Sequence, residues 1–314
     1  MAPMRIVSLL PSATEILFAL GLGDQVVGVS HECDFPPAAR TKAVVIHSRI
    51  PKEASPSEID RLVREFSARG ESVYSVDGEM LRSLSPDLIV TQDLCHVCAA
   101  SPEDLAAVLA TFDQRPEVLC LNPLDLGDVW RDILWVGEQT FRPHAAEKLL
   151  ESIGEKLGAI EQQIQRTTDA PSIAFLEWLQ PIYVGGHWVP EMIGFAGGRD
   201  VFGKPRTPSF RVMVDEVIAA QPDILIVAPC GYSAETARDE YRSMPFPPDW
   251  QSIPAVRNDQ IFYLDANSYF SRPGPRLVTG LEILAKLFHP GLSVSPEADR
   301  AIHPLQLAAH SASV

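Results

Sequence analysis

The chain has 314 residues, of which 46% are hydrophobic and 21% are charged, and its net charge is −15 at pH 7. This length accommodates two domains or one large one, and the composition is that of a soluble globular protein. The negative charge argues against nucleic acids and anionic membrane surfaces as partners.

Hydropathy and cysteine usage bear on location. No stretch reaches the roughly 18 apolar residues of a membrane span, so we expect a chain that is not membrane-embedded. No pattern typical of a secretory signal precedes the first apolar run, residues 6–10. The 5 cysteines, an odd number, do not resemble a secreted disulfide framework. These features predict a cytoplasmic protein, or a periplasmic one if a leader precedes the sequence.

Strand-like and helix-like segments alternate in the first part of the chain. Residues 6–10 predict a strand, and Ser12 and Glu15 have the spacing of a helix cap and its capping-box partner. Apolar runs at residues 26–30 and 88–91 predict further strands. The alternation continues to about residue 122 and indicates an α/β lobe with mostly parallel strands.

A second alternating region begins near Pro171. It includes strand-like runs at residues 172–176, 224–227 and 260–264 and ends with a predicted helix near residues 275–288.

Two short patterns recur between these regions. Residues 84–90 resemble residues 220–227 around a Pro-Asp turn, and residues 19–24 resemble residues 195–200 around a glycine that ends a helix. The repetition favours two related α/β lobes.

Residues 126–169 show apolar side chains at helical spacing, interrupted by Pro143. About 40 helical residues would span about 60 Å, too long for one layer of a small domain. The segment is therefore either one rigid helix joining two lobes or two helices separated at Pro143. We predict an N-terminal lobe over residues 1–125, a connecting helix over 126–169, a C-terminal lobe over 170–290 and a flexible tail over 291–314.

Three loops that follow predicted strands carry sulfur or imidazole. His31, Glu32 and Cys33 follow the first of these strands, and Cys230 and Tyr232 follow the third. The second strand is followed by Gln92, Asp93, Cys95, His96 and Cys98. Ligands of α/β proteins bind outside the carboxyl ends of strands, so we expect these loops to line a ligand site.

Thiolate and imidazole groups suit zinc, iron and cobalt. We identify a candidate metal set that consists of Cys33, Cys95, His96, Cys98 and Cys230. The alternative is that these cysteines are small side chains that line a cleft without binding metal.

Ring-bearing side chains complete the candidate ligand set. Tyr183, His187 and Trp188 surround a Gly-Gly pair, which would allow close backbone approach. This loop is either a flap over a ligand, with Trp178 beside it, or a loop packed on its own lobe. The other candidates in this part of the chain are Ser268 and Tyr269. Aromatic faces offer a large contact area to a ligand.

The order of several motifs resembles a known family. These motifs are residues 7–15 (VSLLPSATE), 27–30 (VGVS), 34–37 (DFPP), 85–90 (SPDLIV) and 271–276 (SRPGPR). Over residues 5–289 the chain resembles the helical-backbone (class III) ABC-importer substrate-binding proteins, nearest their cobalamin-binding branch. The resemblance implies an α/β fold of two Rossmann-like lobes, joined by a long rigid helix, with a ligand cleft between the lobes.

The resemblance also implies a non-catalytic function. Trp178, Tyr183 and Phe210 match or adjoin family ligand positions, and Arg272 matches a polar contact. Glu79 and Asp215 match the acidic residues that dock on an ABC permease, although each is by default a solvated acid at a helix start. The family's first-lobe aromatics are replaced here by the loops with cysteine and histidine.

The leading hypothesis is binding of cobalamin or a related corrinoid, with a cysteine or histidine approaching the cobalt. One alternative is a receptor or sensor for a metal ion, zinc or iron, or for an iron chelate. The other is a thiol-dependent redox or cofactor-processing enzyme, which would need a cysteine with a lowered pKa. We find no Ser-His-Asp elbow, P-loop or GxGxxG after a strand, so we expect no enzyme of those classes.

Overall fold

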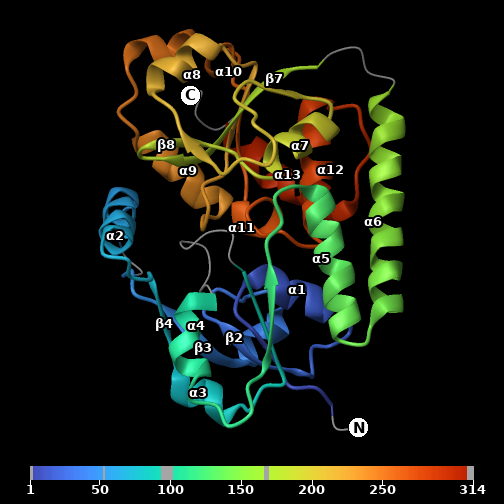
Figure 1. The fold of residues 1–314 in the computed structure, drawn as a ribbon. Coiled ribbons are helices and arrows are strands. Elements are labelled where there is room, and N and C mark those ends of the chain that lie inside the picture. Colours follow the sequence, from blue (N-terminus) through green and yellow to red (C-terminus); the bar gives the residue numbers. More distant parts are fainter. Residues whose placement is uncertain (1–2, 52–53, 93–101, 166–169, 310–314) are drawn as a thin grey trace. The chain divides into compact units, whose positions relative to one another are not determined.

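The computed structural model describes residues 3–51, 54–92, 102–165 and 170–309 (Figure 1). The chain forms two compact units, each considered separately below. Unit 1 comprises residues 1–123 and 127–151, and unit 2 comprises residues 124–126 and 152–314. Each unit contains its own sheet with helices around it, which confirms the predicted α/β class with two lobes.

Unit 1 is built on a sheet with the strand order β4-β3-β2-β1-β5-β6. The strands are β1 (Ile6–Ser8), β2 (Val26–Ser30), β3 (Ala43–Ser48), β4 (Tyr74–Val76), β5 (Leu88–Gln92) and β6 (Glu117–Leu121). All neighbours pair in parallel except β3 and β4. The carboxyl ends of β1, β2 and β5 therefore lie at the same edge, which is where the sequence placed the first two candidate loops.

The helices of unit 1 connect these strands. They are α1 (Pro11–Ala19), the 3-10 helix η1 (Pro37–Thr41), α2 (Pro56–Ala68), α3 (Gly78–Ser83), α4 (Pro102–Leu109), α5 (Leu126–Gln139) and the first part of α6 (Pro143–Ile164). The predicted cap Ser12 is wrong: α1 begins at Pro11, after Leu10. Proline suits the first helical position, and Ser12 and Glu15 are buried within the helix.

Unit 2 has a mixed sheet with the order β10-β8-β7-β11-β12, and β9 pairs with β7. The strands are β7 (Ser172–Leu179), β8 (Ile182–Val184), β9 (Arg199–Asp200), β10 (Phe210–Arg211), β11 (Ile224–Val227) and β12 (Ile261–Tyr263). β7, β11 and β12 are parallel, whereas β8 is antiparallel to β7 and β10.

Helices of unit 2 surround this sheet. They are the end of α6, α7 (Val189–Phe195), α8 (Val214–Ala220), α9 (Ala234–Ser243), the 3-10 helix η2 (Pro248–Ser252), α10 (Pro254–Arg257), α11 (Ala266–Tyr269), α12 (Leu277–Phe288) and α13 (Pro296–Ala309). One cluster of the core gathers Leu176, Val184 and Leu225 from the sheet with Tyr241 and Trp250. These side chains fix the positions of the loops at the carboxyl ends of β7 and β11.

The repeated Pro-Asp turn has the same structure in both units. Ser85 and Gln221, which precede the two prolines, have positive φ of 43° and 46°. Asp87 Oδ2 accepts from the Arg5 amide at 2.7 Å, and Asp223 Oδ2 accepts from the Ser172 amide at 2.9 Å. Each aspartate thus fixes the start of the neighbouring parallel strand, which gives the sequence repeat a physical basis.

We expect the two aspartates to contribute unequally to stability. Asp223 also accepts from the Ser172 hydroxyl at 2.7 Å, and Ser172 is buried. Removing the carboxylate that accepts from both Ser172 donors should lower the free energy of unfolding by about 2–3 kcal/mol. Removing one that accepts only from an exposed amide should lower it by about 1 kcal/mol. Denaturant unfolding should therefore show a larger loss for Asp223→Ala than for Asp87→Ala. Equal losses would contradict this interpretation.

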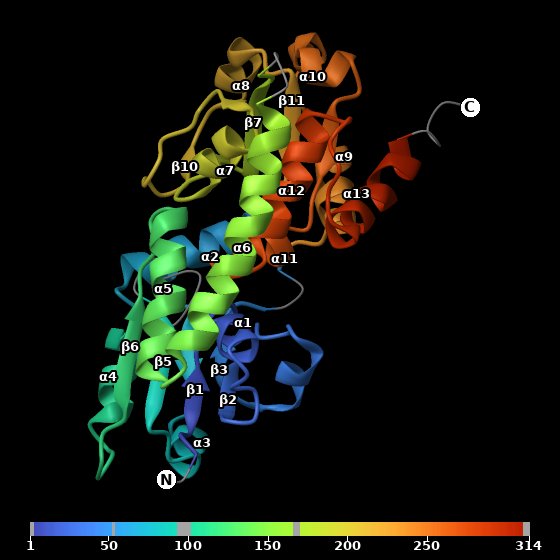
Figure 2. The same ribbon diagram turned by 90° about the vertical axis from the view of Figure 1, so that its right-hand side faces the viewer.

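The segment between the lobes contains two helices, α5 and α6, not one (Figure 2). The break lies at residues 140–142, where Phe141 has a positive φ of 58°, and α6 then begins at Pro143. A proline is disfavoured inside a helix and favoured at its first position, so the second of the two sequence interpretations holds. The 22-residue α6 begins in unit 1 and ends in unit 2.

The predicted flexible tail instead contains α13. Ala298 and Ile302 of α13 are buried, and Figure 2 shows α13 beside α12. Ser295 donates to Glu282 of α12 from both its amide and its hydroxyl, at 2.9 and 2.7 Å. The segment is rich in small and polar residues, so its few apolar side chains, which pack the helix on its unit, were not recognised in the sequence.

Candidate functional site

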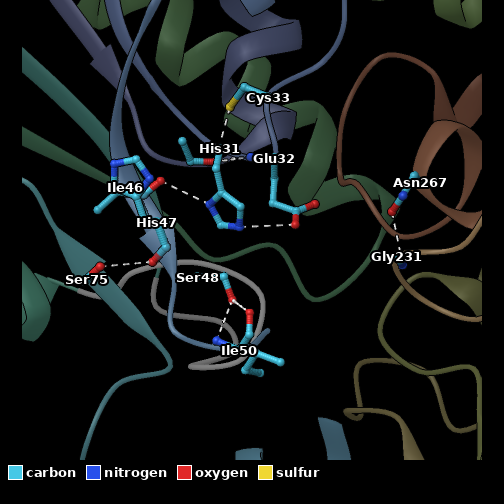
Figure 3. Close-up of polar contacts among 11 residues, drawn as sticks. His31, Glu32, Cys33, Ile46, His47, Ser48, Ile50, Ser75, Gly231 and Asn267 are labelled. Carbon is cyan, nitrogen blue, oxygen red and sulfur yellow. Dashed lines mark hydrogen bonds and ion pairs between the residues drawn. The ribbon is translucent and has the colours of Figure 1, made fainter. Parts of the chain in front are cut away.

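The loop after β2 holds His31 in a defined orientation (Figure 3). His31 Nδ1 lies 3.1 Å from the Ile46 carbonyl oxygen, and Nε2 lies 3.3 Å from Glu32 Oε1. The His31 ring also packs against Tyr74, with 6.0 Å between ring centroids. The strand and the loop were both predicted from the sequence, and the structure brings His31 and Glu32 together.

Cys33 faces the interior of unit 1. It is 5% exposed, and its sulfur accepts from the Thr14 hydroxyl at 3.1 Å and lies 3.5 Å from the Ser30 hydroxyl. This environment is that of a small buried cysteine, the alternative that the sequence left open. Gln92, at the end of β5, is also buried.

Four members of the second candidate loop, Asp93, Cys95, His96 and Cys98, lie outside the described residues. Within the residues that the structure does describe, no group of three or more His, Cys, Asp or Glu side chains could hold a metal ion. Cys230, in the loop after β11, has a free thiol.

Unit 2 presents an aromatic group at the carboxyl ends of β7 and β11. Trp178 lies directly opposite Tyr183 in the antiparallel pair β7–β8. Because directly opposite residues share one face of a sheet, the two side chains are neighbours. The rings of Trp178 and Tyr232 lie 5.5 Å apart, and the Trp178 indole donates to the Gln180 carbonyl at 3.1 Å. We call Trp178, Tyr183 and Tyr232 the aromatic face.

A β-bulge at Glu177 orients this face. The register shifts between Leu176, which pairs with Val184, and Trp178, which pairs with Tyr183. Leu176 and Val184 are core residues, so the extra residue turns Trp178 to the other side of the sheet. Glu177 itself accepts from the Ser209 hydroxyl at 2.8 Å and from the Gly186 amide at 3.3 Å.

Phe210 does not belong to the aromatic face. It pairs with Val184, packs on the core cluster and carries Lys204 Nζ 4.0 Å above its ring. Since Val184 and Tyr183 point to opposite faces of the sheet, Phe210 lies on the side away from Tyr183.

The loop with His187 and Trp188 packs on its own unit, which is the second of the two sequence interpretations. Trp188 is 4% exposed and donates to the Phe270 carbonyl at 2.7 Å. His187 is bound at its amide to the Thr207 carbonyl at 2.7 Å, and burial lowers the pKa of its ring. Gly186 allows a close approach of the chain's own backbone at residues 207–209.

The remaining candidates of unit 2 occupy the loops after β11 and β12. The Cys230 amide donates to the Glu177 carbonyl at 3.2 Å, which ties this loop to the bulge. The Ser268 hydroxyl donates to Asp265 at 2.7 Å as part of a helix cap. Arg272 is 9% exposed, whereas Tyr269 is half-buried with Arg276 above its ring at 5.9 Å.

Sequence reasoning missed two features of unit 2. One is Glu240 on α9, beside Tyr232. The other is a pocket of about 330 Å³. The pocket is lined by residues that include Arg238, Tyr263, Tyr269 and Ala301. Ala301 belongs to α13. Because the sequence analysis interpreted that segment as a flexible tail, the pocket could not be predicted.

Burial perturbs both groups of the Tyr232–Glu240 pair. It raises the pKa of Glu240 to about 7, whereas the neighbouring Tyr232 hydroxyl acts in the opposite direction. Burial, followed by the charge of Glu240, raises the pKa of Tyr232 to about 12. Tyr232 is therefore a neutral phenol beside Trp178.

The Glu240 pKa predicts a pH dependence of stability. Between its unfolded value near 4.5 and its folded value near 7, the folded state binds a proton that the unfolded state releases. We therefore expect thermal stability to fall as the pH rises from about 5 to about 8. Glu240→Gln should flatten this part of the profile, and the exposed Glu235→Gln should not. An unchanged profile in Glu240→Gln would contradict the prediction.

Glu79 and Asp215 are exposed and lie in the first turns of α3 and α8. Negative charge is favourable at a helix N-terminus, so both positions fit the default interpretation of solvated acids.

Comparisons with known proteins identify the family. The family model described as periplasmic binding protein matches residues 6–268. The chain is 24% identical over 278 residues to the vitamin B12-binding protein of Vibrio parahaemolyticus, covering 88% of this chain and 86% of that protein.

Two solved structures align over nearly the whole chain. The heme-binding protein RhuT from Roseiflexus sp. RS-1, in apo form, aligns with a TM-score of 0.70 and 26% identity over 92% of this chain and 99% of RhuT. The vitamin B12-binding protein BtuF of Vibrio cholerae aligns with a TM-score of 0.66 and 23% identity over 90% of this chain and 96% of BtuF.

These findings confirm the predicted resemblance to the ABC-importer binding proteins. The matching family is described as periplasmic, so the predicted cytoplasmic location is not supported. In the described part of the chain, no helix has the length and apolarity needed to cross a membrane. The chain belongs to the periplasmic binding protein family.

Proposed function

We propose that this protein is a non-catalytic, periplasmic binding protein for cobalamin or a related corrinoid. The observation that carries the proposal is the aromatic face of unit 2. Trp178 and Tyr232 have their rings 5.5 Å apart, and Tyr183 is opposite Trp178 on the same face. Half-buried aromatic side chains offer a large apolar area with few rotamers to immobilise, which suits a macrocycle.

The similarity to vitamin B12-binding proteins supports a corrinoid over other large ligands. Haem is the second candidate, because the similarity extends to the heme-binding protein RhuT at 26% identity. Both ligands are metal tetrapyrroles, and the aromatic face alone does not discriminate between them.

Titration calorimetry with cyanocobalamin, cobinamide and haem tests the proposal on the whole chain. We expect saturable binding of a corrinoid at micromolar or lower concentration and weaker binding of haem. If haem binds more tightly than the corrinoids, haem and not a corrinoid is the ligand of this protein. Absence of binding by all three ligands, with metal found in the purified protein, would favour the metal-receptor hypothesis instead.

We further propose that Glu79 and Asp215 dock the protein on an ABC permease. Both carboxylates are exposed at helix starts, where they can meet arginine side chains of a partner. Glu79→Ala and Asp215→Ala should leave the ligand affinity unchanged and reduce transport in a reconstituted importer. Unchanged transport by the double variant would contradict docking through these residues.

A further inference from the structure

The pocket of about 330 Å³ lies wholly within unit 2. Its lining comes from the end of β12 and from the helices α9, α11, α12 and α13, all of which are labelled in Figure 2. It shares no residue with the aromatic face. Ligand pockets commonly range from about 300 to about 1,000 Å³, so this one has room for a small molecule but not for a macrocycle.

Part of the lining is apolar and almost fully buried. Leu264 and Ile283 contribute from the end of β12 and from α12. Ala301 contributes from α13, and its small side chain leaves space that a larger residue would occupy. The ring of Tyr263 also lines the pocket and packs against Tyr241, with 5.6 Å between ring centroids. An apolar group of a ligand would be shielded from water by these residues.

Charges of both signs line the same pocket. Arg238 contributes a guanidinium from α9, and Glu235, in the first turn of the same helix, contributes an exposed carboxylate. Asp265 also lines the pocket, but its carboxylate caps α11 by accepting from the Ser268 amide and hydroxyl, at 2.9 and 2.7 Å. Glu235 is therefore the better placed of the two carboxylates to pair with a ligand.

Arg238 retains donors for a ligand. Its Nε donates to Asp239 Oδ1 at 2.9 Å, and its Nη2 lies 2.8 Å from the same oxygen. A guanidinium carries five N–H groups, so a contact with one oxygen leaves others for a second acceptor. The Asp239 side chain is 65% exposed, and such solvated pairs hold an arginine only weakly. A carboxylate is an acceptor whose two oxygens match the guanidinium.

We propose that this pocket binds a free α-amino acid with an apolar side chain. The α-carboxylate pairs with Arg238 and the α-ammonium pairs with Glu235. Side chains three residues apart on a helix have their Cβ atoms about 5–6 Å from each other, which suits two charges separated by a single carbon atom. The apolar side chain of the ligand packs against Leu264, Ile283 and Ala301. This site is additional to the proposed function and does not depend on it.

Titration calorimetry of the whole chain with L-leucine and L-phenylalanine tests the site. We expect saturable binding of at least one of them, with a Kd below about 1 mM. The corresponding amide lacks the carboxylate, and the corresponding deaminated acid lacks the ammonium. Each should bind at least about tenfold more weakly, because one charged group of the pocket loses its partner. Absence of binding by both amino acids overturns the proposal, and so does an amide that binds as tightly as its amino acid.

Two substitutions on α9 separate the two charges. Arg238→Gln should weaken binding of the amino acid by about tenfold or more and leave that of the amide unchanged, because the amide has no carboxylate. Glu235→Gln should weaken binding of both and leave that of the deaminated acid unchanged. Arg257→Gln is the matched control, since Arg257 is exposed on α10 and does not line the pocket. Wild-type affinity of Arg238→Gln for the amino acid overturns the pairing.

Ala301→Phe tests the location of the site. The added ring would occupy the pocket, so we expect loss of amino-acid binding. Ala159→Phe introduces the same side chain at an exposed position of α6 and should bind as the wild type does. Circular dichroism verifies that both variants are folded. Wild-type affinity in folded Ala301→Phe would show that the amino acid binds elsewhere and overturns the proposal.

Titration of the same variants with cobinamide distinguishes this site from the proposed function. Arg238 and Ala301 lie outside the aromatic face, so Arg238→Gln and Ala301→Phe should bind cobinamide as the wild type does. Loss of cobinamide binding in both variants would show that the pocket belongs to the corrinoid site and overturns a separate one. Wild-type protein that binds an amino acid but no corrinoid removes the proposed function and supports the second site.

Discussion

Trp178→Ala is expected to weaken corrinoid binding by about tenfold to a hundredfold, the usual range for a central aromatic side chain in a binding surface. The loss follows from removing the ring that Tyr232 packs against at 5.5 Å and that lies opposite Tyr183. Trp178→Phe should restore part of the affinity. Titration calorimetry with cobinamide and cyanocobalamin measures the effect, and the two ligands should lose affinity alike.

Trp135→Ala serves as the control for this substitution. Trp135 lies on α5, is 41% exposed and does not belong to the aromatic face. The same affinity for Trp178→Ala and the wild type would mean that the aromatic face is not where the ligand binds. Circular dichroism of both variants verifies that the fold is retained.

Gly186→Ala is expected to cause a large loss of stability, about 3 kcal/mol or more. A Cβ atom at this position would lie 2.2 Å from the Ser209 amide nitrogen and 2.5 Å from the Pro208 carbonyl carbon. Both contacts are with backbone, which cannot move without displacing residues 207–209. Denaturant unfolding of the purified variant measures the loss.

Gly154→Ala makes the same change in side chain but is expected to raise the stability instead of lowering it. Gly154 lies inside α6, and nothing is within 4 Å of an added Cβ there. Alanine is the better helix former, so this variant should gain about 0.5–1 kcal/mol. A loss at Gly186 no larger than about 1 kcal/mol would show that residues 207–209 relax more easily than close packing implies.

Much of the fold is predictable from local sequence patterns. The strands at residues 26–30 and 224–227 are long apolar runs, and their observed bounds agree with the prediction. The repeated Pro-Asp turn was visible as a pattern, and the structure shows that Asp87 and Asp223 have the same role. Such features depend on residues close together in the chain, which is why they can be recognised from one sequence.

Contacts between distant residues account for what the sequence did not reveal. Trp188 resembled an exposed ring in a glycine-containing loop, but its partner is the Phe270 carbonyl, 82 residues away. Phe210 resembled a ligand contact, yet the pairing of β10 with β8 places it with the core. The helix α13 depends on Glu282 of α12, which holds Ser295.

The candidate site was predicted less completely than the fold. The positions of His31 and Glu32 after β2 follow from the strand pattern, but the orientation of the His31 ring depends on its contact with the carbonyl of Ile46 in a different strand. Likewise, nothing in the sequence near Glu240 indicates that burial raises its pKa to about 7. Tertiary packing sets both properties.

The β-bulge at Glu177 has an evolutionary consequence. Without the extra residue, regular alternation would direct Trp178 toward the core and Leu179 away from it. The aromatic face therefore depends on the insertion of a single residue as much as on the identity of its side chains. A deletion or insertion of one codon in this strand would therefore turn different side chains to this face, with most of the sheet preserved.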